Sequence, residues 1–179
     1  MAKSDSFFIR AGTTTNAGTY AESEIDLGSF VNLGVSKSTL LRIHNISVQY
    51  ADSDDVGDRI ADDSGNMIGF QLTTQSQTDL VYATDKSLVS SGSLQLYNGQ
   101  IAEDGSAAGD FATAFVTQDM DIAPQQWRNG YLVGVDALFL GVKMAGAMTS
   151  GNVIVSIVLE CTLENATQAN SVALALSQQ

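Results

Sequence analysis

Two apolar stretches near the C-terminal end decide the fold: YLVGVDALFLGVKM at residues 131–144 and NVIVSIVLECTL at residues 152–163. The first is hydrophobic at both odd and even positions, which is typical of a strand covered on both sides. The second alternates apolar and polar residues, as a strand with one buried face does. Residues 146–151 between them begin and end with glycine and form a turn. We therefore expect two long strands joined as a hairpin in the core of a sheet.

Shorter strands separated by Gly- and Asp-rich loops precede this pair. The segment 39–50 changes the parity of its apolar face at His44-Asn45, which predicts a β-bulge within one long strand. Asn98-Gly99 has strong turn chemistry and is expected to close a short strand at 93–97. The tail from 165 carries too few apolar residues to decide between helix and strand. The other expected strands are 6–10, 20–27, 67–72, 79–83 and 111–117.

The whole pattern is that of an all-β protein. About nine strands, with no internal repeat and no amphipathic helix of useful length, predict an antiparallel β-sandwich or barrel. At 179 residues the chain is long enough for one well-packed core. We expect a single β-sandwich domain over residues 1–179, with 1–5 and 165–179 as terminal arms.

The charge balance argues against nucleic acid as a direct partner. The formal net charge is −12, from 20 acidic and 8 basic residues, and so acidic a surface repels a phosphate backbone. No apolar run reaches the roughly 18 residues that span a bilayer, and no apolar segment of a secretion signal follows residues 1–5. We expect synthesis in the cytoplasm and no transmembrane segment. The basic residues are scattered along the sequence: Lys3, Arg10, Lys37, Arg42, Arg59, Lys86, Arg128 and Lys143.

The residues that enzymes need are scarce. His44 is the only histidine, lies mid-strand at the expected bulge, and has no nucleophilic serine motif around it. Cys161 is the only cysteine and shares the apolar face of its strand, so it is expected to be a buried, inert thiol. One His and one Cys do not make a zinc site, and no phosphate-binding glycine loop is present. We predict that the chain is not an enzyme and needs no cofactor.

A pair of acidic residues raises the question of glycosidase chemistry and of a sugar-binding groove. Glu22 and Glu24 lie on the polar side of an alternating strand, and glycosidases do use two carboxylic acids. Such acids sit in clefts lined by aromatic residues, whereas aromatic residues make up 7% of this chain and Trp127 is the only tryptophan. Glycosidase chemistry is therefore disfavoured.

One acidic loop resembles a calcium site in its spacing. Asp52, Asp54, Asp58 and Asp63 occupy positions 1, 3, 7 and 12 of a loop with EF-hand-like spacing, and Gly57 occupies position 6. Position 5 is Val56, position 12 is not Glu, and strands rather than helices flank the loop. A solvated acidic loop is the simpler interpretation, and calcium binding is a secondary hypothesis. A melting scan with and without calcium tests it, and an unchanged melting temperature would end it.

Several of these features together resemble the single jelly-roll capsid proteins of icosahedral viruses. They are the segments GYLVGVDALFLGV at 130–142 and GNVIVSIVLE at 151–160, the short strands with long Gly- and Asp-rich loops, and the compact chain without a secretion signal. The resemblance is to an architecture, without a specific motif. It implies a jelly roll of eight or nine strands with extended termini, and a function in assembly.

The resemblance also implies partners and a location. A capsid subunit binds copies of itself and other virion or assembly proteins, and it is found in the virion after synthesis in the host cytoplasm. Apolar terminal segments at 7–9 and 172–176 would add to a neighbour's sheet or groove. Residues 1–10 carry one Lys and one Arg, so the basic arm of many genome-binding coats is missing. We therefore expect a shell without direct genome condensation.

Two other functions remain open. The first is a subunit of an extracellular fibre or cell-surface polymer, located at the extracellular surface. The second is a jelly-roll module that binds carbohydrate or another small ligand, which predicts a monomer or small oligomer. Electron microscopy of the purified protein distinguishes shells, filaments and monomers.

Overall fold

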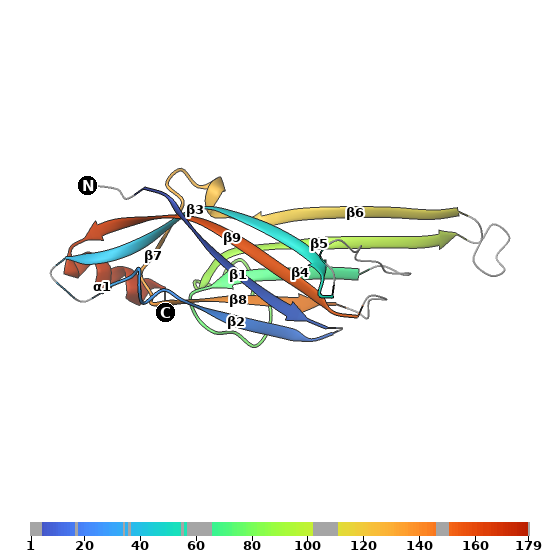
Figure 1. Ribbon diagram of the computed structural model, residues 1–179, viewed down its shortest axis with the longest axis horizontal. Coiled ribbons are helices and arrows are strands. Elements are labelled where there is room, and N and C mark those ends of the chain that lie inside the picture. Colours follow the sequence, from blue (N-terminus) through green and yellow to red (C-terminus); the bar gives the residue numbers. More distant parts are fainter. Residues whose placement is uncertain are drawn as a thin grey trace.

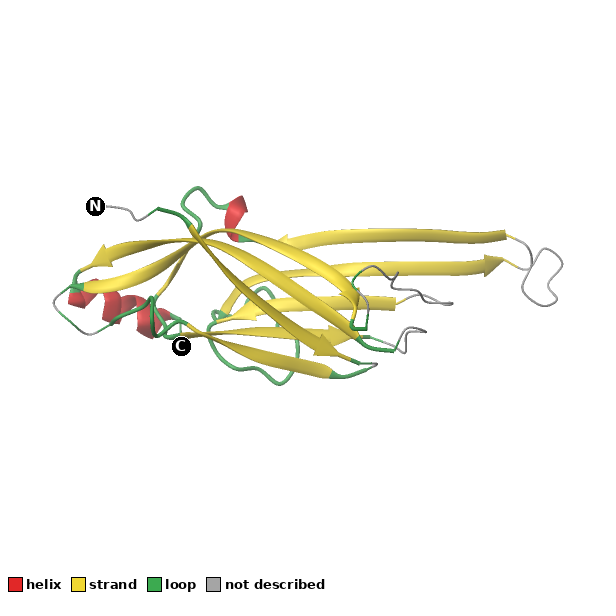
Figure 2. Cartoon of the chain, in the orientation of Figure 1, coloured by secondary structure: helices red, strands yellow, loops and turns green. Residues whose placement is uncertain are grey.

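The computed structural model describes residues 5–16, 18–33, 35, 37–54, 56, 66–101, 111–145 and 151–178. These residues form nine β-strands in two antiparallel sheets, and one α-helix, α1 (Gln168–Ser177) (Figure 1; Figure 2). The first sheet, called the β1 sheet below, has the strand order β1 (Phe7–Thr15), β9 (Val153–Ala166), β3 (Ser38–Asp52), β7 (Tyr131–Val133). The β6 sheet has the order β2 (Tyr20–Asp26), β8 (Ala137–Met144), β4 (Asn66–Thr73), β5 (Leu88–Ile101), β6 (Phe111–Ile122).

The strand order makes the sandwich a jelly roll. With β6 set aside, the pairs β3–β9 and β4–β8 join strand pairs into the two sheets, and the other antiparallel pairs are β1–β9, β2–β8, β3–β7 and β4–β5. These are the pairs of one long hairpin, first strand with last and second with second last, folded over into two sheets. Strand β6 pairs with β5 and lengthens its sheet to five strands. The predicted all-β jelly-roll sandwich is confirmed.

The prediction of a hairpin in the C-terminal third is wrong. Residues 131–144 form two strands, β7 and β8, which lie in different sheets. Strand β8 pairs with β2 and β4, while β9 lies between β1 and β3 in the other sheet. An apolar pattern reports that a strand is covered but not which strand is its neighbour. Here the chain crosses from one sheet to the other between β7 and β8, and again between β8 and β9.

The turn expected at Asn98-Gly99, in the middle of the chain, is not observed. The ladder of β5 and β6 continues through Asn98-Gly99, where Asn98 pairs with Ala114 and Gly99 with Thr113. Pairing along the whole length of two strands outweighs the turn preference of one dipeptide. The strand expected at 79–83 is part of the loop that joins β4 to β5. The tail, for which the sequence did not decide between helix and strand, forms α1 with Thr167 as its N-cap.

The bulge at His44 is confirmed. The pairing of β3 with β9 shifts register between Ile43 and Asn45, and this keeps Leu41, Ile43 and Ile46 buried on the same side. His44 Nε2 lies 2.9 Å from the Thr162 hydroxyl oxygen on β9. A hydrogen bond to the neighbouring strand therefore holds the histidine in place at the irregular position.

The core lies between the two sheets, and both supply it. Phe70 of β4 meets the ring of Tyr50 of β3 edge-on, with 6.4 Å between ring centroids. Large aliphatic side chains surround them and are almost fully buried: Leu41, Ile43, Ile68, Leu72, Leu138, Leu140, Ile157 and Leu159.

Cys161 belongs to this core and is fully buried, as predicted. Burial, with a smaller contribution from Glu160, raises the pKa of its thiol to about 12, so the thiol stays protonated at neutral pH. We predict that a thiol-specific chromogenic reagent leaves the native protein unmodified and reacts with about one thiol per chain in denaturant. Rapid reaction of the native protein would contradict this assignment.

The C-terminal helix is attached to its own chain. The Gln178 side-chain amide donates to the Leu132 carbonyl oxygen at 2.6 Å and accepts from the Gly134 N–H at 2.8 Å. The Thr74 hydroxyl donates to the Gln178 carbonyl oxygen at 2.6 Å. Near the start of α1, the Ser171 and Ser38 hydroxyls form a buried hydrogen bond. The proposal of terminal arms at 1–5 and 165–179 concerns the assembled protein and stays a prediction.

Candidate functional site

Among the described residues, four strands lie at sheet edges, and the Gln178 side chain already bonds the backbone beside one of them, β7. The four are β1 and β7 in one sheet, and β2 and β6 in the other. Strand β7 has three residues, whereas β6 has twelve and pairs with β5 on one side. An edge strand presents unpaired N–H and C=O groups to any chain that can align with it. Strand β6 is therefore a long open edge of this fold.

Strands β5 and β6 also extend past the ends of the other strands as a two-stranded ribbon (Figure 1). The Gln118 side-chain amide still reaches the Val48 carbonyl oxygen of the opposite sheet, at 3.4 Å. Two residues farther out on the same face, Val116 is 67% exposed and pairs with half-buried Leu96. Two-stranded ribbons are marginally stable in water without a covering partner. The ribbon is thus a surface that a second molecule can complete.

An apolar groove runs beside α1. It has a volume of 880 Å³ and is walled by the helix on one side and by β3, β7 and β9 on the other. Leu40, Leu132 and Leu174 supply apolar surface, and Lys37 and Asn170 add polar groups. The size falls within the range of small-molecule sites.

A second cavity, called the polar hollow below, lies next to this groove, and one ion pair lies between the two. Arg42, His44, Arg128, Asn129 and Glu164 line it, with a volume of 380 Å³, and Arg42 and Glu164 line both cavities. Arg42 Nε donates to Glu164 Oε1 at 2.6 Å, Nη2 donates to Oε2 at 2.8 Å, and Nη1 donates to the Asn129 carbonyl oxygen at 2.6 Å. These hydrogen bonds raise the pKa of Arg42 above its usual value. The bidentate Arg42–Glu164 ion pair, which has a defined geometry, therefore separates the two cavities.

The fold thus gathers basic residues that are scattered in sequence. Strand alternation places Arg42 and His44 on one face of β3, a relation that the two-residue spacing already shows. Arg128 arrives from the segment after the short 3₁₀ helix η1 (Pro124–Gln126), which contacts β3. The Gln125 side chain holds that contact by bonding both the N–H and the carbonyl of Ile46. The place of Arg128 in the hollow could not be predicted, because nothing in the local sequence links this residue to β3.

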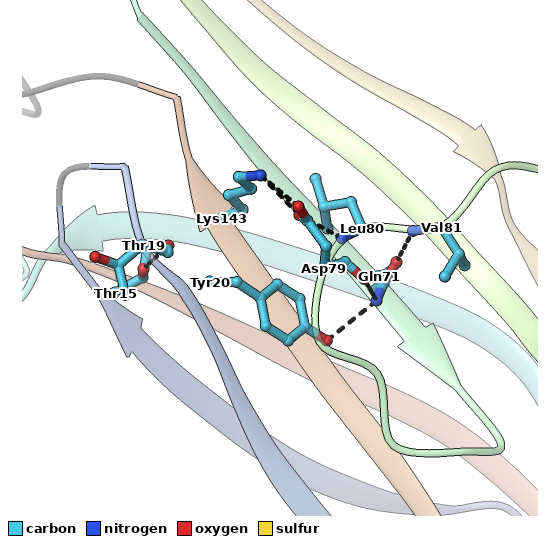
Figure 3. Close-up of polar contacts among 8 residues, drawn as sticks. All are labelled: Thr15, Thr19, Tyr20, Gln71, Asp79, Leu80, Val81 and Lys143. Carbon is cyan, nitrogen blue, oxygen red and sulfur yellow. Dashed lines mark hydrogen bonds and ion pairs between the residues drawn. The ribbon is translucent and has the colours of Figure 1, made fainter.

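A second polar cluster is structural and fixes the loop between β4 and β5 (Figure 3). Gln71 is fully buried, and its side chain bonds the Tyr20 hydroxyl, the Asp79 carbonyl and the Val81 N–H. Lys143 Nζ lies 2.7 Å from Asp79 Oδ2, and hydrogen bonds from Lys143 and from the backbone hold the pKa of Asp79 below its usual range. Burial, and then the hydrogen bond to Glu22, raise the pKa of Tyr20. The cluster ties residues 74–87 to the β6 sheet.

Glu22, one of the two acids considered for glycosidase chemistry, is bound into the same loop. Its carboxylate accepts from the Tyr20 hydroxyl at 2.7 Å, the Ser76 hydroxyl at 2.6 Å and the Gln77 N–H at 2.9 Å. Glu24 is exposed two residues along the edge strand β2. The pair does not converge on a cavity in the described part of the chain.

Gly141 makes room for this cluster. A Cβ at position 141 would overlap the Tyr20 hydroxyl and ring. We predict that Gly141→Ala lowers the free energy of unfolding by about 1–3 kcal/mol through overpacking, measured by urea denaturation. The matched control is Gly12→Ala, also in a strand, where the nearest atom to an added Cβ is the Ser156 hydroxyl oxygen at 3.3 Å. Equal losses in both variants would show that the Tyr20 contact does not matter.

The calcium hypothesis stays a prediction. Asp52 ends β3 and is buried, and its carboxylate accepts from the Asp54 N–H at 2.8 Å, which is a turn-stabilising contact. Asp58 and Asp63 lie outside the described residues. Within the described part, no group of three or more His, Cys, Asp or Glu side chains is placed to hold a metal ion. Nor does that part contain a helix long and apolar enough to cross a membrane.

Comparisons with known proteins return structures only. No family model matches the sequence, and no curated protein matches it. Among solved structures, VP1 of Human Polyomavirus 12 in complex with 3'-sialyllactosamine is 8% identical, with a TM-score of 0.47 over 91% of this chain and 100% of that one. Apo VP1 of New Jersey Polyomavirus is 7% identical, with a TM-score of 0.44 over 90% and 99%. The unassembled VP1 pentamer of Merkel Cell Polyomavirus is 7% identical, with a TM-score of 0.40 over 89% and 94%.

Proposed function

We propose that this chain is a structural subunit that assembles with copies of itself into the shell of a virus particle. The observation that carries the proposal is the jelly roll with a long open edge, β6, extended into a ribbon that stands clear of the sandwich. Jelly rolls occur in capsids, in lectins and in cupins. The open edge and the ribbon favour the first of these, because they are surfaces that a further subunit completes.

The chemistry of the β6 edge supports controlled assembly. Asp119 and Asp121 are exposed on this strand, and exposed charges on an edge oppose unlimited addition of strands. The proposed contacts close into rings rather than open filaments, which requires that the rotation between neighbouring subunits closes. Exposed Val116 on the inner face of the ribbon supplies apolar area to such a contact.

The proposed shell leaves its genome to other components. A chain with a net charge of −12 has no electrostatic drive toward nucleic acid. The partners are therefore copies of the chain and other virion proteins, and the site of function is the virion. Strong binding of the isolated subunit to nucleic acid at physiological salt would contradict this part of the proposal.

Assembly is tested by light scattering with size exclusion over a range of concentrations, followed by negative-stain microscopy. We expect rings or closed shells for the wild-type chain. Val116→Glu places a charge on the ribbon and raises the concentration needed for assembly by about tenfold or more, since desolvating an unpaired charge costs several kcal/mol and each ~1.4 kcal/mol is a factor of ten. Tyr82→Glu, at a position 86% exposed in the loop after β4, is the matched control and is expected to assemble normally. A wild-type monomer at all concentrations would refute the proposal.

A second candidate function is a small-ligand-binding module, and the apolar groove is the observation that favours it. The groove combines a volume of 880 Å³ with leucine side chains from both walls. This function predicts a monomer whose melting temperature rises with a bound apolar ligand. Screening a set of small amphipathic compounds by thermal shift, with Leu132→Asp as the blocked control, separates it from the assembly function.

A further inference from the structure

The polar hollow and the adjoining end of the groove hold a large share of the positive charge of this acidic chain. The chain has 8 Lys and Arg residues and 1 His. Three of the eight Lys and Arg residues line the two cavities, namely Lys37, Arg42 and Arg128, and His44 lines the polar hollow beside them. One carboxylate, Glu164, faces them among the described lining residues.

The charges in the hollow do not balance within the described chain. Both oxygens of Glu164 accept hydrogen bonds from Arg42, so this carboxylate already has a cationic partner. His44 bonds Thr162 through Nε2. The Arg128 side chain is exposed, lines the same hollow, and makes no ion pair with any described residue. The hollow therefore presents an unmatched guanidinium beside a rigid ion pair.

We infer that the polar hollow receives an exposed carboxylate from a second copy of this chain. The inference rests on the proposed function and names the contact that orients neighbouring subunits. Two copies with a net charge of −12 repel each other over most of their surfaces, so a close approach needs a place where the charges are opposite. The hollow is such a place, and a guanidinium binds a carboxylate with a defined geometry.

Exposed carboxylates are abundant on the surfaces that a second copy would present. Glu24 and Asp26 are exposed on the edge strand β2, and Asp119 and Asp121 are exposed on the edge strand β6. Complementary charge of this kind sets orientation and register between subunits. A contact through the hollow would therefore bring the α1 end of one subunit against an acidic edge of the next.

The test compares two charge reversals with the same change in net charge. Arg128→Glu reverses the charge in the hollow, and Lys86→Glu reverses an exposed lysine in the loop before β5 that lines neither cavity. We expect Arg128→Glu to raise the concentration for half-assembly by about tenfold at low salt, because like charges then face each other across the contact. Lys86→Glu is expected to stay within about twofold of wild type. The difference is expected to shrink as salt rises.

The outcomes separate this inference from the proposed function. If the wild-type chain assembles and both variants shift equally, the hollow is not a contact and the inference alone is wrong. A wild-type chain that stays monomeric overturns both. Equal melting temperatures of the two variants exclude misfolding as the cause, and Arg128→Gln, which removes the charge without reversing it, is expected to lie between wild type and Arg128→Glu.

Discussion

Phe70→Ala is expected to lower the free energy of unfolding by about 3–5 kcal/mol. Phe70 is 1% exposed and lies on β4, the central strand of the β6 sheet. Its ring contacts Tyr50 of the other sheet and lies so close to Gly92 that a Cβ there would be 2.8 Å from it. Truncation removes the buried ring and leaves a cavity between two hydrogen-bonded sheets, which cannot collapse to fill it.

Urea denaturation followed by tryptophan fluorescence measures this loss. Tyr82→Ala is the matched control, since it removes an aromatic ring that is 86% exposed and is expected to change stability by about 0.5 kcal/mol or less. A loss for Phe70→Ala no larger than that of the control would mean that the sandwich is not packed around this residue.

Glu164→Ala is expected to destabilise the protein by about 3 kcal/mol. The side chains of Arg42 and Glu164 are 16% and 10% exposed, so both charges have lost most of their hydration. Removing the carboxylate leaves the Arg42 guanidinium with the Asn129 carbonyl as its described partner. A buried charge without a counter-ion costs more than the ion pair itself contributes.

The double variant Arg42→Met with Glu164→Leu distinguishes charge from packing. It replaces both charges by apolar side chains of similar length and is expected to recover most of the stability lost in Glu164→Ala. Measuring Arg42→Met and Glu164→Leu singly as well completes a mutant cycle and gives the coupling energy of the pair. If the double variant is as unstable as Glu164→Ala, the loss comes from packing and not from the unpaired guanidinium.

Features that depend on short-range alternation were predicted correctly. The parity change at His44-Asn45 is the bulge observed between Ile43 and Asn45, because a strand must keep one face toward the core. The alternation around Cys161 placed its thiol in the core for the same reason. Both predictions need only the twofold period of a strand.

Features that depend on the choice of partner were not predictable. The pattern at residues 131–144 indicated coverage on two sides but not that β7 and β8 belong to opposite sheets. The turn expected at Asn98-Gly99 was overridden by the long ladder to β6, which begins after the intervening segment. Helix α1 depends on tertiary contacts at Ser171 and Gln178, and its apolar residues alone do not indicate a helix.

The residues of the polar hollow were likewise predictable only in part. The spacing of Arg42 and His44 already puts them on one face of a strand, whereas Arg128 joins them through the docking of η1 on β3. By itself, then, the sequence determined an all-β sandwich with one bulged strand and a buried thiol, because each follows from residue type and local period. The tertiary structure alone decided which strands are neighbours, where the edges stay open and which charges meet. Those depend on contacts between residues far apart in the chain, which local periodicity does not encode.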